Sequence, residues 1–147
     1  MIFFVDSSAL VKLYVEEPGS DRMRSLADRE RHLAASDLAF AEIHASFARR
    51  RREGHFRPEE FEELAQRWTE DWQSLMRVPI GAEALALIPG LCETHPLRGA
   101  DAIHLASALL LQEHGLEVTF TCSDRALLEA ARSEGLFLYD PTLPSSP

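Results

Sequence analysis

Four acidic residues of the sequence stand at positions where a parallel α/β fold would gather them into one metal-binding cluster. Asp6 ends the first apolar run of the chain, and Asp124 follows another near the C-terminus. Glu42 and Asp101 fall in the first turns of two helix-like segments. In an open parallel sheet, ligand sites form beyond the carboxyl ends of the strands. Four carboxylates gathered there repel one another unless a divalent cation joins them, so the pattern predicts a metal site.

Each of these acids also has an ordinary structural explanation. Asp6 and Asp124 each precede a predicted helix, where a carboxylate can cap free backbone amides. Asp101 opens a strongly apolar helix, where it can interact with the helix dipole and pair with Arg98. Glu42 taken alone is explained as a solvated helix residue. The metal hypothesis therefore depends on the four acids coming together in the fold.

Two kinds of side chain near the acids have supporting roles in this hypothesis. Ser7 and Ser8 directly follow Asp6, and either hydroxyl can support the carboxylate as a hydrogen-bond donor. His104 lies one helical turn after Asp101. We interpret His104 as a core histidine with one hydrogen bond rather than as a ligand, because hard cations prefer oxygen.

Strand-like and helix-like segments alternate along the chain, which is the arrangement needed to position these acids. Short apolar runs predict strands at 2–6, 32–35, 76–80, 117–121 and 136–139. Helical periodicity and capping signals predict helices at 7–15, 20–30, 37–53, 58–75, 82–94, 99–114 and 124–133, with Pro89-Gly90 bending or splitting the fifth. This alternation predicts a three-layer α/β/α sandwich around a parallel sheet. We expect one domain over residues 1–140 and a flexible tail over 141–147.

Composition excludes several classes of protein. The 147 residues suffice for one domain with a real core, and no apolar stretch is long enough to span a membrane. We expect a cytoplasmic location, because the chain starts with a short strand rather than a signal sequence. Cys92 and Cys122 do not form a disulfide framework, and both are expected to be reduced and mostly buried. The sequence contains no dinucleotide fingerprint, no phosphate-binding loop of the Walker type and no H-E-x-x-H motif.

The charge distribution bears on a nucleic-acid substrate. The formal net charge is −9, which disfavours phosphate binding unless positive charge is gathered locally. The run Arg49–Arg52 is the one dense basic segment, and Arg98 and Arg125 lie beside two of the acids. Arg49, Arg50 and Arg51 are therefore candidate phosphate contacts. The alternative interpretation is a solvated helix end, where cations suit the helix dipole.

Aromatic residues are concentrated in the middle of the chain, and they raise the question of self-association. The residues concerned are Phe40, Phe47, Phe56, Trp68 and Trp72. They outnumber what one side of a small sheet obviously needs, so we expect the helices around 37–75 to contribute apolar surface to a homodimer. The alternative interpretation is that all of them lie in the core.

Four segments together resemble the PIN-domain family, and within it the VapC-type toxins of bacterial toxin–antitoxin pairs. The matching segments begin at Val5-Asp6-Ser7-Ser8, Ala41-Glu42, Arg98-Gly99-Ala100-Asp101 and Ser123-Asp124-Arg125. Each segment is short, but their order and spacing are fairly specific, and the resemblance covers the chain from Ile2 to about Tyr139.

The resemblance implies a five-stranded parallel α/β/α sandwich that cuts RNA with Mg²⁺ or Mn²⁺. The acids of the family correspond to Asp6, Glu42, Asp101 and Asp124, and its small hydroxyl residue corresponds to Ser7. The resemblance also implies a cognate antitoxin and a homodimer as partners. The sequence departs from the family at Cys122, where a threonine is common. Because a thiol is a poor hydrogen-bond partner for a carboxylate, Ser123 is expected to support Asp124 instead.

The competing hypothesis is a catalytically inert PIN-like binding module. An acidic sheet end could hold a partner protein or a structural ion without cutting RNA. Metal-dependent cleavage that Asp6→Asn abolishes discriminates the two hypotheses.

Overall fold

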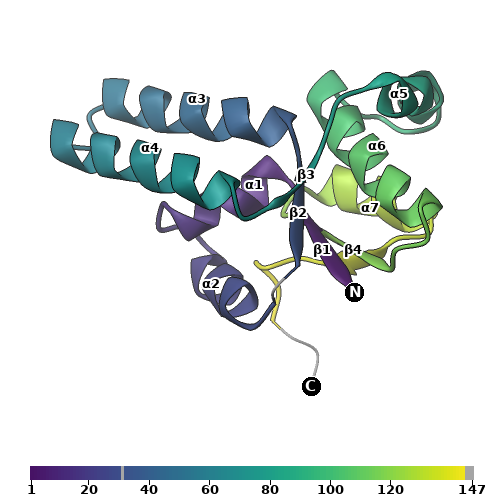
Figure 1. The fold of residues 1–147 in the computed structure, drawn as a ribbon, viewed down its shortest axis with the longest axis horizontal. Helices are drawn as coiled ribbons and strands as arrows, with labels where there is room; N and C mark the ends of the chain where they lie inside the picture. Colours follow the sequence, from purple (N-terminus) through teal and green to yellow (C-terminus); the bar gives the residue numbers. More distant parts are fainter. Residues whose placement is uncertain (31, 145–147) are drawn as a thin grey trace.

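Five short apolar segments form one parallel sheet in the computed structural model, which describes residues 1–30 and 32–144 (Figure 1). The strands are β1 (Ile2–Val5), β2 (Leu33–Ser36), β3 (Met76–Val78), β4 (Val118–Thr121) and β5 (Phe137–Tyr139). Their order across the sheet is β3-β2-β1-β4-β5, and every neighbouring pair is parallel. The predicted five-stranded parallel sheet is confirmed.

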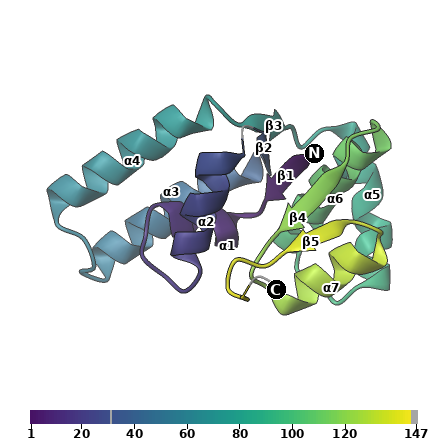
Figure 2. The same ribbon diagram turned by 90° about the horizontal axis from the view of Figure 1, so that it is seen from below.

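The strand order places a change of direction at the centre of the sheet. From β1 the chain moves outward through β2 to β3, then returns to β4 beside β1 and continues to β5 (Figure 2). At such a switch point the segments that follow the two central strands diverge and leave a crevice, where ligand sites form in folds of this class. The switch point here lies beyond Val5 and Thr121, which are paired in the β1–β4 register.

Helices cover both faces of the sheet, as the alternation of segments predicts. They are α1 (Ser7–Leu10), the 3₁₀ turn η1 (Val11–Leu13), α2 (Ser20–Arg29), α3 (Leu38–Arg52), α4 (Pro58–Trp72), α5 (Ala82–Thr94), α6 (Gly99–Glu113) and α7 (Arg125–Ser133). Within the described residues, no helix is long and apolar enough to cross a membrane.

Helix α5 continues through Pro89, so of the two predicted effects of Pro89-Gly90, a bend or a split, the split does not occur. Proline removes the hydrogen bond to the carbonyl of the residue four positions earlier, which is Leu85. Leu85 is 54% exposed, so this turn of α5 lies on the surface of the protein, where a proline is tolerated more easily than in a buried turn.

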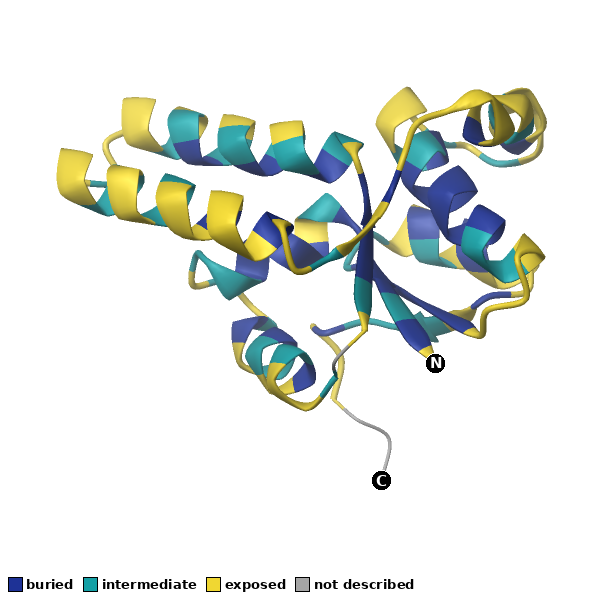
Figure 3. Ribbon diagram, viewed as in Figure 1, coloured by how far each residue is buried: buried dark blue, intermediate teal, exposed yellow. Residues whose placement is uncertain are grey.

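Two apolar clusters hold the helical layers against the sheet (Figure 3). One cluster joins the sheet to α5, α6 and α7, and its largest buried side chains include Phe4, Leu105 and Phe120. The other joins the sheet to α1, α2, α3 and α4 through residues such as Leu10 and Phe47. Because side chains alternate along a strand, β1 contributes to both clusters and fixes both layers relative to its carboxyl end.

The aromatic residues of α3 and α4 pack within the chain. Phe47, Trp68 and Trp72 are buried, and Phe40 and Phe56 are partly buried against the same cluster. The indole nitrogen of Trp68 also donates a hydrogen bond to the carbonyl of Phe40 at 3.3 Å. The core interpretation of these residues therefore holds, and they do not supply the exposed apolar surface expected for a dimer.

The segment after β5 is tied to α2, which corrects the expectation of a flexible tail for residues 141–144. Pro141 is buried, and the guanidinium of Arg22 donates a hydrogen bond to the carbonyl of Leu143. The backbone at Gly19 lies so close that an added Cβ would stand 2.9 Å from the carbonyl oxygen of Pro141. Residues 145–147 lie outside the described residues.

Replacing Gly19 with alanine should therefore destabilise the protein more than the same change at another glycine of similar backbone conformation. Gly19 and Gly54 both have positive φ, at 93° and 80°, which costs an alanine about 1–2 kcal/mol. Only Gly19→Ala also pushes a methyl group against Pro141, which adds about 1 kcal/mol or more. Urea unfolding of Gly19→Ala and Gly54→Ala measures the difference, and equal losses would contradict this docking of the tail.

Candidate metal-binding site

Asp6 lies at the switch point, directly after β1, and forms the N-cap of α1. Its Oδ1 accepts hydrogen bonds from the Ala9 amide at 3.0 Å and the Ser8 hydroxyl at 2.8 Å, and its Oδ2 accepts from Cys122 Sγ at 3.1 Å. The residue is only 4% exposed. Burial raises the pKa of the carboxyl group above its ordinary value, although the nearby His104 and these donors act in the opposite direction. Burial rather than crowding among carboxylates is therefore the main cause of the shift.

Cys122 joins Asp6 to the segment that follows β4. Its thiol donates to Asp6 Oδ2, and its sulfur accepts a hydrogen bond from the backbone amide of Asp124 at 3.1 Å. Burial, followed by the negative charge of Asp6, raises the pKa of this thiol. The thiol thus supports the first acid, a role that the sequence analysis did not assign to it. Cys92 is exposed, contrary to expectation.

Asp124 is held by its own helix rather than by Ser123. Its Oδ1 accepts a hydrogen bond from the amide of Leu127 at 2.9 Å, which makes Asp124 the N-cap of α7. The buried hydroxyl of Ser123 makes no hydrogen bond to any described residue. The expected support from Ser123 is therefore absent, because the N-cap geometry already supplies a donor to the carboxylate.

Glu42 reaches the site from α3 and is fixed by two donors on the same oxygen. Oε1 accepts hydrogen bonds from Ser7 Oγ at 2.8 Å and from His104 Nε2 at 2.6 Å. The hydrogen bond from His104 is the largest cause that lowers the pKa of this carboxyl group. Ser7 therefore supports Glu42, while Ser8 takes the place beside Asp6 that was open to either serine.

Asp101 lies in the first turn of α6, as predicted, and it binds the start of its own helix. Its Oδ2 accepts a hydrogen bond from the backbone amide of Arg98 at 3.3 Å, and the Arg98 side chain stands 4.0 Å away. The structural explanation of Asp101 is thus observed. His104 follows one turn later and is 3% exposed, which agrees with its interpretation as a core histidine, but its Nε2 lies near two side chains, Glu42 at 2.6 Å and Ser7 at 3.4 Å.

Hydrogen bonds link three of the four acids across the edge of the sheet. Cys122 connects Asp6 with the backbone of Asp124, and Ser7, the residue after Asp6, bonds to Glu42. The fourth acid, Asp101, stands on the same helix as the histidine that contacts Glu42. The carboxyl end of the central strands thus carries a hydrogen-bonded group that includes Asp6, Glu42 and the backbone of Asp124, whereas Asp101 contacts Arg98 at the start of α6.

As the side chains stand, however, the described residues include no group of three His, Cys, Asp or Glu side chains placed to hold one ion together. The prediction that Asp6, Glu42 and Asp101 reach a single ion is not met in this arrangement. The physical reason is local: Glu42 is turned toward His104, and Asp101 is turned toward the Arg98 amide. Each of these carboxylates is thus satisfied by a hydrogen-bond donor close to it.

The chemistry of the donors nevertheless fits a hard divalent cation. Glu42, Asp101 and Asp124 are each anchored through one carboxylate oxygen, and the other oxygen accepts no hydrogen bond from the described part of the chain. Mg²⁺ and similar ions prefer carboxylate oxygens and keep several waters, so they need few protein ligands.

The candidate phosphate contacts differ in their surroundings. Arg50 is paired with Glu17 at 3.4 Å, and the guanidinium of Arg51 lies 4.8 Å from the ring centre of Phe61. Arg49 is exposed near the far end of α3 (Figure 1). Arg98 and Arg125 are exposed at the starts of α6 and α7, beside two of the acids.

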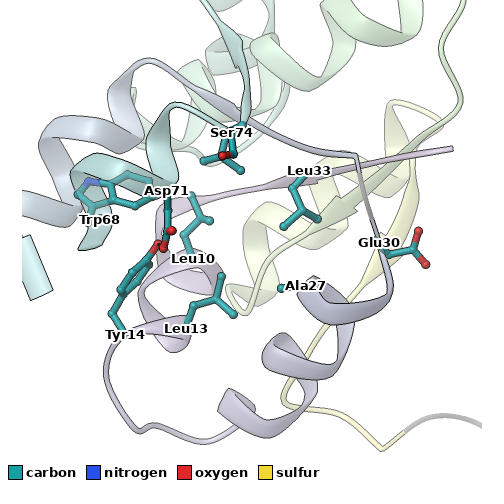
Figure 4. Close-up of a pocket in the computed structure, with 10 residues that line it drawn as sticks. Leu10, Leu13, Tyr14, Ala27, Glu30, Leu33, Trp68, Asp71 and Ser74 are labelled. Carbon is teal, nitrogen blue, oxygen red and sulfur yellow. The ribbon is translucent and has the colours of Figure 1, made fainter. Parts of the chain in front are cut away.

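A separate cavity of about 300 Å³ opens between η1, α2 and α4 (Figure 4). Its walls are apolar at Leu10 and Leu33, and Tyr14 donates a hydrogen bond to Asp71 at 2.6 Å on its rim. The lining includes none of the four acids, so this cavity is distinct from the switch-point site.

Comparison with known proteins identifies the family of the chain. The family model described as PIN domain matches residues 3–133. Ribonuclease VapC45 of Mycobacterium tuberculosis (strain CDC 1551 / Oshkosh) is 34% identical over 134 residues, which span 91% of this chain and 92% of the relative.

Two solved structures share the fold. A toxin–antitoxin complex from Klebsiella pneumoniae contains a chain with a TM-score of 0.59 and 18% identity, covering 84% of this chain and 87% of that one. VapC20 of Mycobacterium tuberculosis, described as a Sarcin-Ricin loop cleaving toxin, has a TM-score of 0.65 and 16% identity, covering 91% of this chain and 95% of that one. The match over nearly the whole chain shows that this protein belongs to the PIN-domain family.

Proposed function

We propose that this protein is an endoribonuclease of the VapC type that hydrolyses RNA phosphodiesters with a divalent metal ion, Mg²⁺ or Mn²⁺. The observation that carries the proposal is the hydrogen-bonded arrangement at the switch point, where donors fix the carboxylates of Asp6 and Glu42 and Cys122 joins Asp6 to the backbone of Asp124. Support also comes from the relative named ribonuclease, which matches nine-tenths of the chain.

The chain's own residues account for binding and orientation in this proposal. Asp6, Glu42, Asp101 and Asp124 would hold the metal ion, which supplies an activated water and neutralises charge at the leaving oxygen. Ser8 and Cys122 keep the Asp6 carboxylate in place, and Ser7 keeps Glu42 in place. Because these donors are built into the start of α1 and the end of β4, the acids are positioned before substrate arrives.

The proposed partners are the RNA substrate, a cognate antitoxin protein and a second copy of the chain. The antitoxin is suggested by the solved toxin–antitoxin complex that shares this fold. The homodimer stays a prediction, which sedimentation at micromolar concentration can test.

The purified protein should cut RNA only when a divalent metal ion is present. We expect cleavage with Mg²⁺ or Mn²⁺, loss of cleavage with excess EDTA, and recovery when the metal is restored. The alternative is an inert binding module, which is favoured by the lack of a ready-made three-ligand cluster among the described side chains. An absence of cleavage with both metals, on RNA that contains varied single-stranded loops, would support that alternative.

Arg49 is the arginine of the basic run best placed to contact RNA beside the cut site. It follows Glu42 by about two helical turns on nearly the same face of α3, roughly 10 Å further along the axis. Arg51 points to about the opposite side of the helix and rests on Phe61. Arg49→Gln should therefore weaken RNA binding and reduce its salt dependence by about one phosphate contact, whereas Arg51→Gln should not.

Salt-dependent RNA binding of the two variants provides the measurement, with Asp6→Asn as the background so that RNA is not cut. Both substitutions remove one positive charge, so a general effect of net charge would appear equally in both. Equal salt slopes in the two variants would assign the run to a solvated helix end.

A further inference from the structure

His104 belongs to α6, the helix that carries Asp101, and its side chain contacts Glu42 on α3. Its Nε2 lies 2.6 Å from Glu42 Oε1 and 3.4 Å from Ser7 Oγ, and Ser7 Oγ lies 2.8 Å from the same Glu42 oxygen. These three side chains come from α1, α3 and α6 and form a closed triangle of polar contacts. Because a carboxylate only accepts hydrogen bonds, His104 must carry its proton on Nε2.

Packing alone does not explain a histidine at this position. Residues Leu105 to Leu110 of α6 are all buried, and His104 itself is 3% exposed. Its Nδ1 is buried with no hydrogen-bond partner among the described residues. A methionine or leucine would fill a similar volume without leaving a buried polar atom unpaired. The favourable contact that offsets this penalty is the charge-assisted bond to Glu42.

The contact determines which Glu42 oxygen is available. Both donors, Ser7 and His104, bind Oε1, and within the described chain Oε2 accepts no hydrogen bond. The Glu42 side chain is 34% exposed, so without these donors it would sample several rotamers in solvent. When both donors bind, Oε1 of Glu42 is fixed and Oε2 keeps its lone pairs free of hydrogen bonds from the described chain.

We propose that His104 is a positioning residue that orients Glu42 for metal binding without ligating the metal. The inference rests on the proposed function, because it assigns Glu42 to the metal site. Residues that orient a metal ligand in this way typically contribute 10–100-fold to metal affinity. His104 therefore completes a set of donors in which Ser8 and Cys122 serve Asp6 while Ser7 and His104 serve Glu42.

The test uses substitutions of His104 that differ in whether a hydrogen-bond donor can reach Glu42. Glutamine places its amide nitrogen close to the position of histidine Nε2, whereas asparagine is too short to reach Glu42, and methionine has a suitable length but no donor. We expect calorimetric titration with Mn²⁺ alone to show affinity within a few-fold of the parent protein for His104→Gln. Affinity should fall about 10–100-fold for His104→Asn and His104→Met.

A double-mutant cycle links the effect to Glu42. In a Glu42→Gln background, His104→Met should change Mn²⁺ affinity little further, because the carboxylate that it positions is gone. Thermal melting of each variant without metal checks the fold. If His104→Met fails to fold, the comparison of His104→Gln with His104→Asn decides, since both are amides that differ only in reach.

The outcomes separate this inference from the proposed function. A parent protein that binds Mn²⁺ and cuts RNA, together with unchanged Mn²⁺ affinity in His104→Asn and His104→Met, would show that His104 only fills the core. An equal loss in the Gln and Asn variants would likewise overturn the inference, because rescue should follow reach. A parent protein that neither binds Mn²⁺ nor cuts RNA would overturn the proposed function and this inference with it.

Discussion

Replacing Asp6 with asparagine is expected to abolish metal-dependent RNA cleavage while leaving the fold intact. Asparagine has nearly the same shape, and its side-chain oxygen can still accept the hydrogen bonds that Ala9 and Ser8 donate to Asp6 Oδ1. It lacks the negative charge that a hard cation requires. Removing residues that only orient metal ligands costs 10–100-fold, so loss of a ligand should lower the cleavage rate by about 100-fold or more. Asp101→Asn should behave in the same way.

Asp28→Asn is the matched control for this experiment. Asp28 is an exposed residue of α2, outside the switch point, and its replacement changes the net charge by the same amount. RNA cleavage should be unaffected in this variant at equal Mn²⁺ concentration. Full activity of Asp6→Asn, with circular dichroism showing a native fold, would remove Asp6 from the metal site and defeat the proposed mechanism.

The sequence predicted the architecture well because the fold depends on patterns that are local. Short apolar runs separated by amphipathic segments fit only a buried parallel sheet with helical layers, and all five strands lie where these runs occur. Of the bend or split expected at Pro89, the split does not occur, and a proline signal does not show whether its turn of the helix lies on the surface. The docking of residues 141–144 was missed for a similar reason, since it depends on contact between Pro141 and Gly19, which are distant in sequence.

The sequence could place the candidate acids on elements of the fold, but it could not give their hydrogen bonds. Asp6 and Asp124 could be placed together because both follow strands that are neighbours at a switch point. The partner of each carboxylate depends on side-chain direction at the ångström scale, which spacing does not give. Ser7 and Ser8 illustrate the difficulty, because these adjacent residues at the start of α1 bond to different acids: Ser7 to Glu42 and Ser8 to Asp6. A buried cysteine beside an acid, such as Cys122, was a signal that could have been interpreted as a donor.

The same substitution that removes activity should stabilise the protein when no metal is present. Burial raises the pKa of the Asp6 carboxyl group, so the folded state resists ionisation of this group. An ionised carboxylate at this buried position therefore costs more free energy than the neutral amide that replaces it. Asp6→Asn should raise the free energy of unfolding by about 1 kcal/mol or more, which corresponds to roughly 2–4 °C in Tm for each kcal/mol.

The direction in which the Tm difference between Asp6→Asn and the parent protein changes with pH is a stricter test than the increase in stability at one pH. Below the ordinary pKa of 3.8, Asp6 is protonated in both the folded and the unfolded state, so the carboxyl group carries no ionisation penalty. As pH rises through the raised folded-state pKa, the parent protein loses stability that Asp6→Asn retains. The Tm difference between the two proteins, measured in EDTA, should therefore grow with rising pH and then level off.

Added metal should reverse the order of stability. Mn²⁺ at about 100 times its dissociation constant stabilises a protein by about 2.7 kcal/mol, or roughly 5–10 °C for a chain of this size. The parent protein should gain this increment and Asp6→Asn should not, so that the parent becomes the more stable of the two. A variant that is less stable than the parent in EDTA at every pH would mean that the Ser8 and Cys122 hydrogen bonds outweigh the cost of burying the charge. Such a result would contradict the proposal that burying the negative charge of Asp6 is unfavourable until a cation neutralises it.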